Sequence, residues 1–126
     1  MSFVILLGRF FYSAIFIMSA LGHFSPEAKM YAEAQGVPYA SFLVPFSGII
    51  ALVGGLSILL GFKAKIGGWL LVIFLVPVTI MMHRFWVVSD PLIMSYQQAV
   101  FAKNVSMLGA ALIIAYFGSG PFSLKR

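Results

Sequence analysis

Residues 39–62 read YASFLVPFSGIIALVGGLSILLGF, a stretch without a single charged side chain. An α-helix rises about 1.5 Å per residue and the hydrocarbon core of a bilayer is about 30 Å thick, so about 20 apolar residues can cross it. The stretch does not alternate between polar and apolar residues, as the strands of a membrane β-barrel do. It therefore predicts a transmembrane helix.

Three further apolar stretches of similar character cover most of the remaining chain, at residues 2–22, 67–86 and 102–118. The composition is 62% hydrophobic and only 9% charged, whereas soluble domains are about 25% charged. Because lipid offers no hydrogen-bond partners to the backbone, each span must satisfy its own N–H and C=O groups as a helix. We predict an all-α, polytopic membrane protein in which residues 1–126 form one four-helix transmembrane bundle.

A polar segment at residues 25–38 separates the first two spans and predicts a short helix at the membrane interface. Ser25 is a suitable N-cap, and Pro26 suits the first helical position. Gly36 and Pro38 provide a stop signal at the other end. The helix is interpreted as a capped connector, with a lid that folds back over the bundle as the alternative.

Positive charges are unevenly distributed between the two ends of the predicted bundle. One end carries Arg9, Lys63, Lys65, Lys125 and Arg126. The other end carries Lys29, Arg84 and Lys103 together with all three acids, Glu27, Glu33 and Asp90. By the positive-inside rule the first end is cytoplasmic, which predicts that both termini lie in the cytoplasm. The net charge of +5 does not indicate nucleic-acid binding, because the positive residues form no cluster with interleaved aromatic residues.

Small residues recur at helical spacing in two of the spans. Ser47, Ala51 and Gly55 lie four residues apart in the second span, and the fourth span has a similar series at Ala102 and Ser106 that continues to Ala110. Small side chains let membrane helices approach closely. These series predict helix–helix seams, either within one bundle or between the two copies of a homodimer.

Ionisable side chains at membrane depth are the first candidates for function. Arg9 lies about 10 Å along the first predicted helix. Its guanidinium either extends to the lipid headgroups or makes a buried contact, with backbone carbonyls, a quinone or a lipid headgroup as the partners considered.

At the opposite end the up-down topology brings together His23, His83, Arg84, Lys103 and Asn104. Two facing imidazoles can ligate a b-type haem, but these two lie at the edge of the spans, which disfavours haem. An imidazole beside an arginine can instead hydrogen-bond a quinone carbonyl. The third interpretation is a set of interfacial side chains satisfied by water and phosphate. No metal site and no catalytic motif is predicted, and the lack of cysteine excludes thiol chemistry by this chain alone.

The order of several short motifs resembles the DoxX family of small four-helix bacterial membrane proteins. Along the chain these motifs are Gly8-Arg9, Gly22-His23-Phe24, Gly36-Val37-Pro38, Gly54-Gly55, His83-Arg84-Phe85-Trp86 and Lys103-Asn104. The resemblance implies an inner-membrane subunit or anchor of a redox enzyme, with a quinone as the candidate cofactor. It also implies that this chain is not an enzyme on its own, and that Arg9, His23, His83, Arg84, Lys103 and Asn104 are the matching positions.

Two alternatives from other functional classes remain open. A small dimeric solute or ion transporter is compatible with the size of the chain, but no carboxylate lies within a span to carry a proton or cation cycle. An anion path past Arg9 is still compatible with the sequence. The other alternative is a structural assembly factor that binds a larger membrane protein through the small-residue series of the second span.

Overall fold

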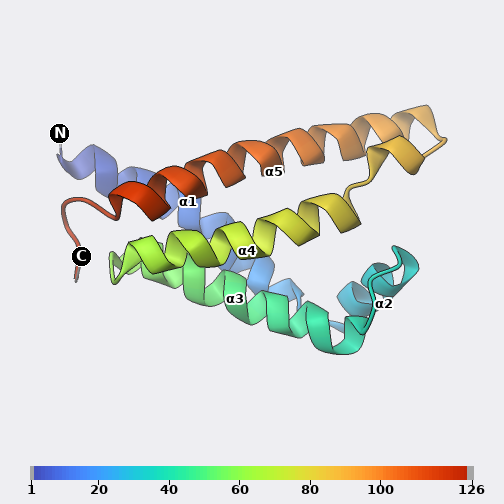
Figure 1. Ribbon diagram of the computed structural model, residues 1–126, viewed down its shortest axis with the longest axis horizontal. Helices are drawn as coiled ribbons and strands as arrows, with labels where there is room; N and C mark the ends of the chain where they lie inside the picture. The colour runs from blue at the N-terminus through green and yellow to red at the C-terminus, as the bar shows by residue number, and fades with distance from the viewer. Residues whose placement is uncertain (1, 125–126) are drawn as a thin grey trace.

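The computed structural model describes residues 2–124, and within that range the only regular elements are helices (Figure 1). In chain order these are α1 (Ser2–Gly22), α2 (Pro26–Ala34), α3 (Ala40–Leu60), α4 (Ala64–Met82), the 3-10 turn η1 (Phe85–Val87) and α5 (Pro91–Phe117). Four of the described helices, α1, α3, α4 and α5, are long and apolar enough to cross a membrane. The prediction of an all-α, four-span membrane protein is confirmed.

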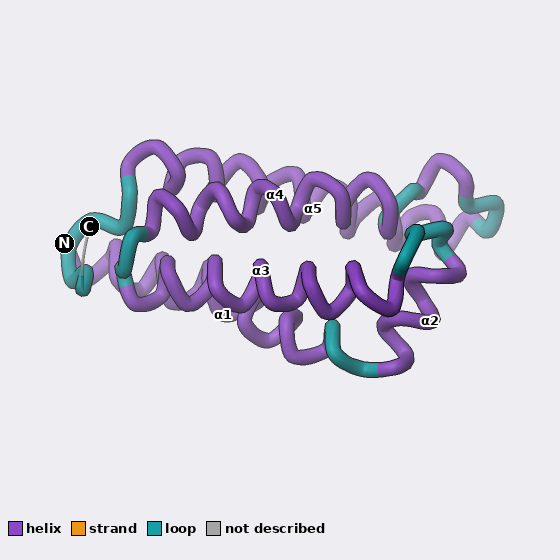
Figure 2. Tube along the Cα trace, turned by 60° about the horizontal axis from the view of Figure 1, so that its bottom comes forward, coloured by secondary structure: helices purple, strands orange, loops and turns teal. Residues whose placement is uncertain are grey.

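The four long helices form two layers, with α1 packed on α3 and α4 packed on α5 (Figure 2). The layers are joined mainly by α3 and α4, whereas α1 and α5 are not among the closely packed pairs. Chain order therefore follows spatial order around the bundle. Consecutive long helices touch, and the first and last are the pair left loosely joined.

α3 and α4 approach most closely near the turn that connects them. Built on the backbone, a Cβ at Gly54 would lie 3.1 Å from the Gly67 carbonyl oxygen, and one at Gly67 would lie 3.0 Å from the Gly54 carbonyl oxygen. Only glycine permits two helix backbones to approach so closely. Figure 1 shows that the two helices separate from this contact toward the end of the molecule where α2 lies.

The small-residue series of α3 is a seam inside the bundle. Ala51 is fully buried, and a Cβ at Gly55 would lie 3.4 Å from the Ser13 carbonyl oxygen of α1. Gly48 belongs to the same face, where its Cβ would lie 2.6 Å from His23 Cβ. The corresponding series of α5 is different, because Ala102 and Ser106 are exposed in the described structure.

The connector between the first two spans is a helix, as predicted. The Ser25 hydroxyl accepts a hydrogen bond of 3.2 Å from the Ala28 N–H, and Pro26 occupies the first turn. The helix ends at Ala34, and Gly36 follows with a positive φ of 85°. α2 packs on the start of α3, where Ala32, Ala40 and Val44 form a small apolar cluster.

α5 begins eleven residues before the apolar stretch from Ala102 that was used to predict it. Its N-cap is Asp90, whose carboxylate accepts hydrogen bonds of 2.9 Å from Leu92 N–H and 3.4 Å from Ile93 N–H. Pro91 then occupies the first helical position. The extra turns contain Ser95, Gln97 and Gln98, whose polarity hid them from a search for apolar residues.

Candidate functional site

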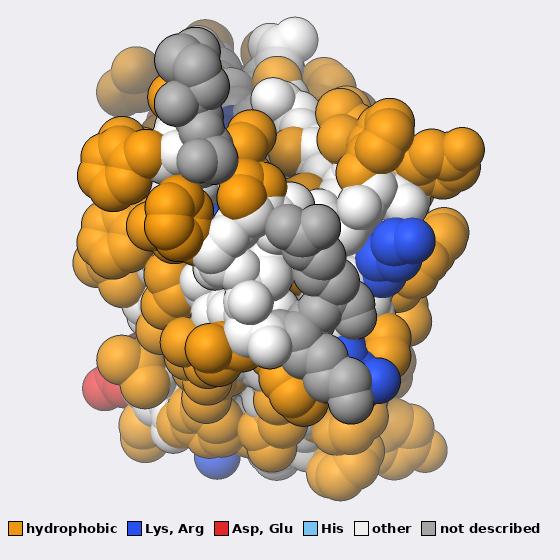
Figure 3. Space-filling view, turned by 90° about the vertical axis from the view of Figure 1, so that its left-hand side faces the viewer, with side chains coloured by type: hydrophobic (Ala, Val, Ile, Leu, Met, Phe, Trp, Pro, Cys, Tyr) orange, Lys and Arg blue, Asp and Glu red, His pale blue; other side chains and the backbone are white. Residues whose placement is uncertain are grey.

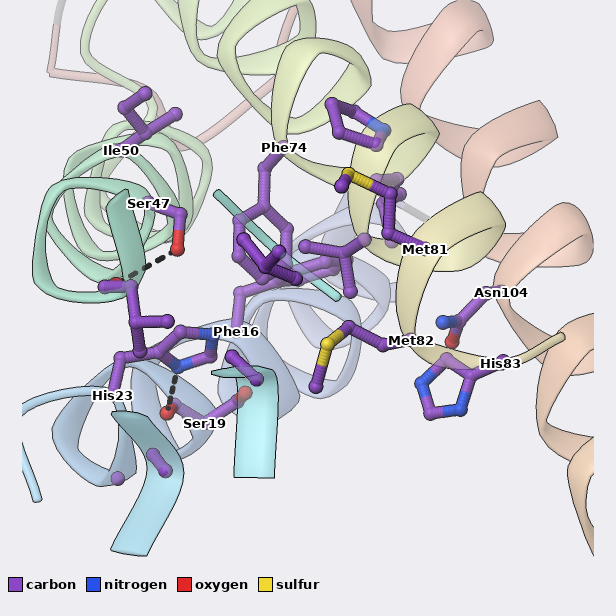
Figure 4. A pocket seen from close by; sticks show the side chains of 18 of the residues that line it. Phe16, Ser19, His23, Ser47, Ile50, Phe74, Met81, Met82, His83 and Asn104 are labelled. Atoms are coloured by element: carbon purple, nitrogen blue, oxygen red, sulfur yellow. Dashed lines mark hydrogen bonds between the residues drawn. The ribbon is translucent and has the colours of Figure 1, made fainter. Parts of the chain in front are cut away.

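The separation of α3 from α4 leaves a cavity of about 700 Å³ between the two layers, in the half of the bundle near α2. All five α-helices contribute to its walls, which are mostly apolar; Phe16, Ile50 and Phe74 are examples (Figure 4). Pockets that bind small molecules are typically about 300–1,000 Å³, mainly apolar, with a few placed polar groups. This cavity has the size and the lining of a ligand site.

Four of the six residues singled out in the sequence line the cavity, namely His23, His83, Lys103 and Asn104. They come from the end of α1, the end of α4 and the middle of α5. The structure therefore brings together residues that are up to 81 positions apart in the chain. The two histidines lie on different sides of the cavity in Figure 4.

His23 is held by its own helix and by an aromatic neighbour. Its Nδ1 lies 2.8 Å from the Ser19 carbonyl oxygen, and its ring lies 5.5 Å from that of Phe74, edge to face. A carbonyl only accepts hydrogen bonds, so Nδ1 carries the proton. Nε2 is the ring nitrogen that this contact leaves available.

His83 belongs to a polar chain that crosses three elements. Its Nδ1 lies 2.8 Å from Gln97 Oε1, and the amide nitrogen of Gln97 donates a 3.4 Å hydrogen bond to the Tyr31 hydroxyl. These contacts join the end of α4 to α5 and then to α2. His83 is thereby fixed at the edge of the cavity.

Asn104 is the most buried polar group of the cavity, with only 5% of its surface exposed. Its amide makes no side-chain hydrogen bond to any residue of the described range, and Figure 4 shows it beside His83 at the cavity wall. An amide carries both an N–H donor and a carbonyl acceptor. Asn104 therefore offers both a donor and an acceptor to an occupant of the cavity.

Arg84 lies outside the cavity lining and serves as a link to α2. One of its terminal nitrogens donates a hydrogen bond to the carbonyl oxygen of Gln35, the residue that caps the end of α2. The contact joins residues 49 positions apart. It holds α2 against the side of the bundle where the cavity lies.

Arg9 lies at the other end of the bundle, where both termini are found (Figure 1). It is 5% exposed and donates hydrogen bonds of 3.0 Å to Ser123 Oγ and 2.6 Å to the Phe122 carbonyl oxygen. Of the alternatives left open by the sequence, the buried contact to a backbone carbonyl is the one present. Arg9 is hydrogen-bonded to the C-terminal segment and does not line the cavity.

Comparison with known proteins gives the chain a family. The model of the DoxX family matches residues 4–84, which is more than half of the chain. The chain belongs to the DoxX family. The inner membrane protein YqjF of Escherichia coli (strain K12) is 27% identical to it over 124 residues, which cover 97% of this chain and 89% of that protein. No solved structure matches the chain.

The family match and the cavity overlap only in part in this DoxX protein. Residues 4–84 include Arg9, His23, His83 and Arg84, whereas Lys103 and Asn104 lie beyond the matched range. The α5 wall of the cavity is thus the part that the family model does not describe. It is also where Asn104 is located.

Sequence reasoning did not single out Gln97, Tyr96 or Met107, which belong to the site. Tyr96 and Met107 line the cavity, and Gln97 orients His83. Together with Val100 and Asn104, Tyr96 and Met107 recur every three or four residues along one face of α5. That periodicity, read from the Asp90-Pro91 cap onward, is the signal that could have identified them.

Proposed function

We propose that this DoxX protein is a membrane subunit that binds a quinone-type molecule in its cavity and anchors a redox enzyme at the membrane. The observation that carries the proposal is Asn104, a residue that is only 5% exposed and places its amide in the wall of an otherwise mostly apolar cavity. A quinone combines an apolar ring with carbonyl acceptors. Its ring fits the apolar walls, and one carbonyl could accept a hydrogen bond from Asn104.

The neighbouring polar residues support the same kind of ligand. Lys103 adds a cationic donor at an exposed position of α5, and His83 is oriented by Gln97 at the edge of the same cavity. Arg9 and Arg84 have structural roles in this proposal, because each is hydrogen-bonded to the backbone outside the cavity. The residues of this chain bind and orient the quinone, and the partner enzyme supplies the electron transfer.

We further propose that the protein lies in the inner membrane with both termini in the cytoplasm. The relative from E. coli is named as an inner membrane protein. Lys63, on the turn between α3 and α4, and Lys65, in the first turn of α4, are both exposed at the same end as the termini. Figure 3 shows lysine and arginine side chains on that end of the molecule. Positive residues of this kind favour the cytoplasmic side.

The test is binding of decylubiquinone to the protein reconstituted in lipid nanodiscs. We expect saturable binding that weakens about tenfold in Asn104→Leu, because the change removes a buried hydrogen bond and leaves a ligand carbonyl unpaired. The matched control is Ser106→Leu, two residues further along α5 and exposed. Equal affinity in Asn104→Leu and the unchanged protein, or no saturable binding at all, would refute the proposal.

The alternatives receive less support from the geometry. An anion path past Arg9 would need a free guanidinium, whereas two of its nitrogens are hydrogen-bonded to the C-terminal segment. The assembly hypothesis depended on the small-residue series of α3, and that series packs against α1. The quinone-binding subunit is therefore the function that the geometry supports best.

A further inference from the structure

α1 and α5 are the neighbouring long helices with the least contact in the bundle. The other neighbouring pairs of long helices pack closely along at least part of their length, but α1 and α5 are not among the closely packed pairs. One side-chain hydrogen bond joins the two helices in the described structure, from the Tyr12 hydroxyl to the Met107 carbonyl oxygen at 2.7 Å. Toward α2 from that bond, Ile15 and Ser19 of α1 both line the cavity and are exposed.

The opening lies at a depth where the surroundings are hydrocarbon. Ile15 is 13 residues from the start of α1, which places it about 20 Å along a helix that rises 1.5 Å per residue. It is 39% exposed, and its apolar side chain suits contact with lipid tails. A molecule dissolved in the bilayer can reach this opening without crossing the water on either side of the membrane.

Two polar residues of the cavity belong to a helix that borders the opening. Asn104 and Lys103 belong to α5, the helix that forms one edge of the seam. A headgroup bonded to Asn104 therefore lies against one of the two helices that border this gap. The Tyr12–Met107 hydrogen bond limits this gap on the side away from α2.

We infer that the seam between α1 and α5 is a lateral entrance from the bilayer, used by a lipid-soluble molecule with a long hydrocarbon chain. Its head lies at Asn104, and its chain passes out over Ile15 and Ser19 into the lipid. The inference rests on the proposed function, since it takes the cavity to be a ligand site. It adds the route of entry and the requirement for a chain.

The experiment compares two probes in nanodiscs, decylubiquinone and the same ring without a chain. Ser19→Trp places a large ring in the seam at an exposed position, so its effect on folding is small. We expect this variant to bind decylubiquinone about tenfold more weakly and the chainless ring with an affinity that changes by less than about threefold. Met18→Trp is the matched control, because Met18 is 72% exposed and does not line the cavity.

A second variant tests the seam without adding bulk. Tyr12→Phe removes the hydrogen bond to Met107, so decylubiquinone should bind and leave several-fold faster while its equilibrium affinity changes little. Unchanged rates would count against the entrance.

The inference is overturned if Ser19→Trp affects both probes equally or neither. It is also overturned if the chain-selective loss appears instead in Ile73→Trp, because Ile73 is an exposed cavity residue on α4 and would indicate an exit between α3 and α4. Those results leave quinone binding intact. If the unchanged protein binds neither probe, the proposed function fails as well, so the two failures can be distinguished.

Discussion

Gly68 shows how one residue sets the spacing of two membrane helices. A Cβ at this position would lie 2.7 Å from the backbone nitrogen of Ala115 and 3.0 Å from the carbonyl oxygen of Ala111, both on α5. Backbone atoms of a packed helix cannot move aside as a flexible side chain can. We expect Gly68→Ala to destabilise the protein by about 1–3 kcal/mol, measured as a lower unfolding temperature in detergent.

The control for this change is Gly109→Ala on α5, where a new Cβ would have no atom within 4 Å. Alanine is the better helix former, so this variant should be neutral or more stable by up to about 1 kcal/mol. An equal loss of stability in both variants would contradict the prediction that the contact between α4 and α5 causes the effect of Gly68→Ala.

At the residue scale, the sequence predicted which single residues have a structural role, but not which residues they contact. The sequence placed Arg9 at membrane depth and offered snorkelling or a buried contact, but its partners Phe122 and Ser123 lie 113 and 114 positions away. Nothing local to Arg9 specifies that pairing. Gly55 was likewise predicted to lie in a seam, yet only the folded bundle shows that α1 fills it.

At the scale of elements, the C-terminal segment depends on Arg9. Besides the two hydrogen bonds from the guanidinium, Leu124 N–H donates to the Leu60 carbonyl oxygen at 3.1 Å. Hydrogen bonds from charged donors contribute about 1.5–3 kcal/mol each. Arg9→Gln should therefore raise the hydrogen-exchange rate of residues 118–124 about tenfold or more while the exchange of α3 and α4 stays protected.

Lys63→Gln is the control for the segment, because it removes a positive charge at the same end from an exposed side chain. It should leave the exchange of residues 118–124 unchanged. Faster exchange in both variants would mean that the positive charge at this end of the molecule protects the segment from exchange, and that the hydrogen bonds of Arg9 do not.

Capping residues predicted the start of a helix correctly where they were taken into account. The Ser25-Pro26 pair predicted the start of α2, and the structure has it there. Asp90-Pro91 is the same kind of signal, but the polar turns that follow it led to a prediction that began at Ala102. Hydropathy indicates which residues suit lipid, and a helix that begins before the apolar residues is invisible to it.

At the scale of the whole molecule, the cavity follows from helices that meet at one end and diverge at the other. Gly54 and Gly67 allow the close contact, while α2 occupies the wide end and is tied to the bundle by Arg84. The sequence predicted that five of the six candidate residues lie at one end of the bundle, and four of these five line the cavity. It could not predict the divergence, because that depends on the volumes of side chains packed between helices far apart in the chain.

The orientation of the whole bundle is open to a direct test, since the chain contains no cysteine. Single cysteines at Lys63→Cys, on the turn between α3 and α4, and Glu33→Cys, on α2, mark its two ends. Because positive residues favour the cytoplasmic side, a membrane-impermeant maleimide added to intact spheroplasts should label Glu33→Cys, whereas Lys63→Cys should react only after lysis. The opposite pattern would place the termini outside and would put α2 and the polar end of the cavity on the cytoplasmic side. The seam between α1 and α5 would open to lipid in either orientation, so the result decides on which side a redox partner can approach the headgroup.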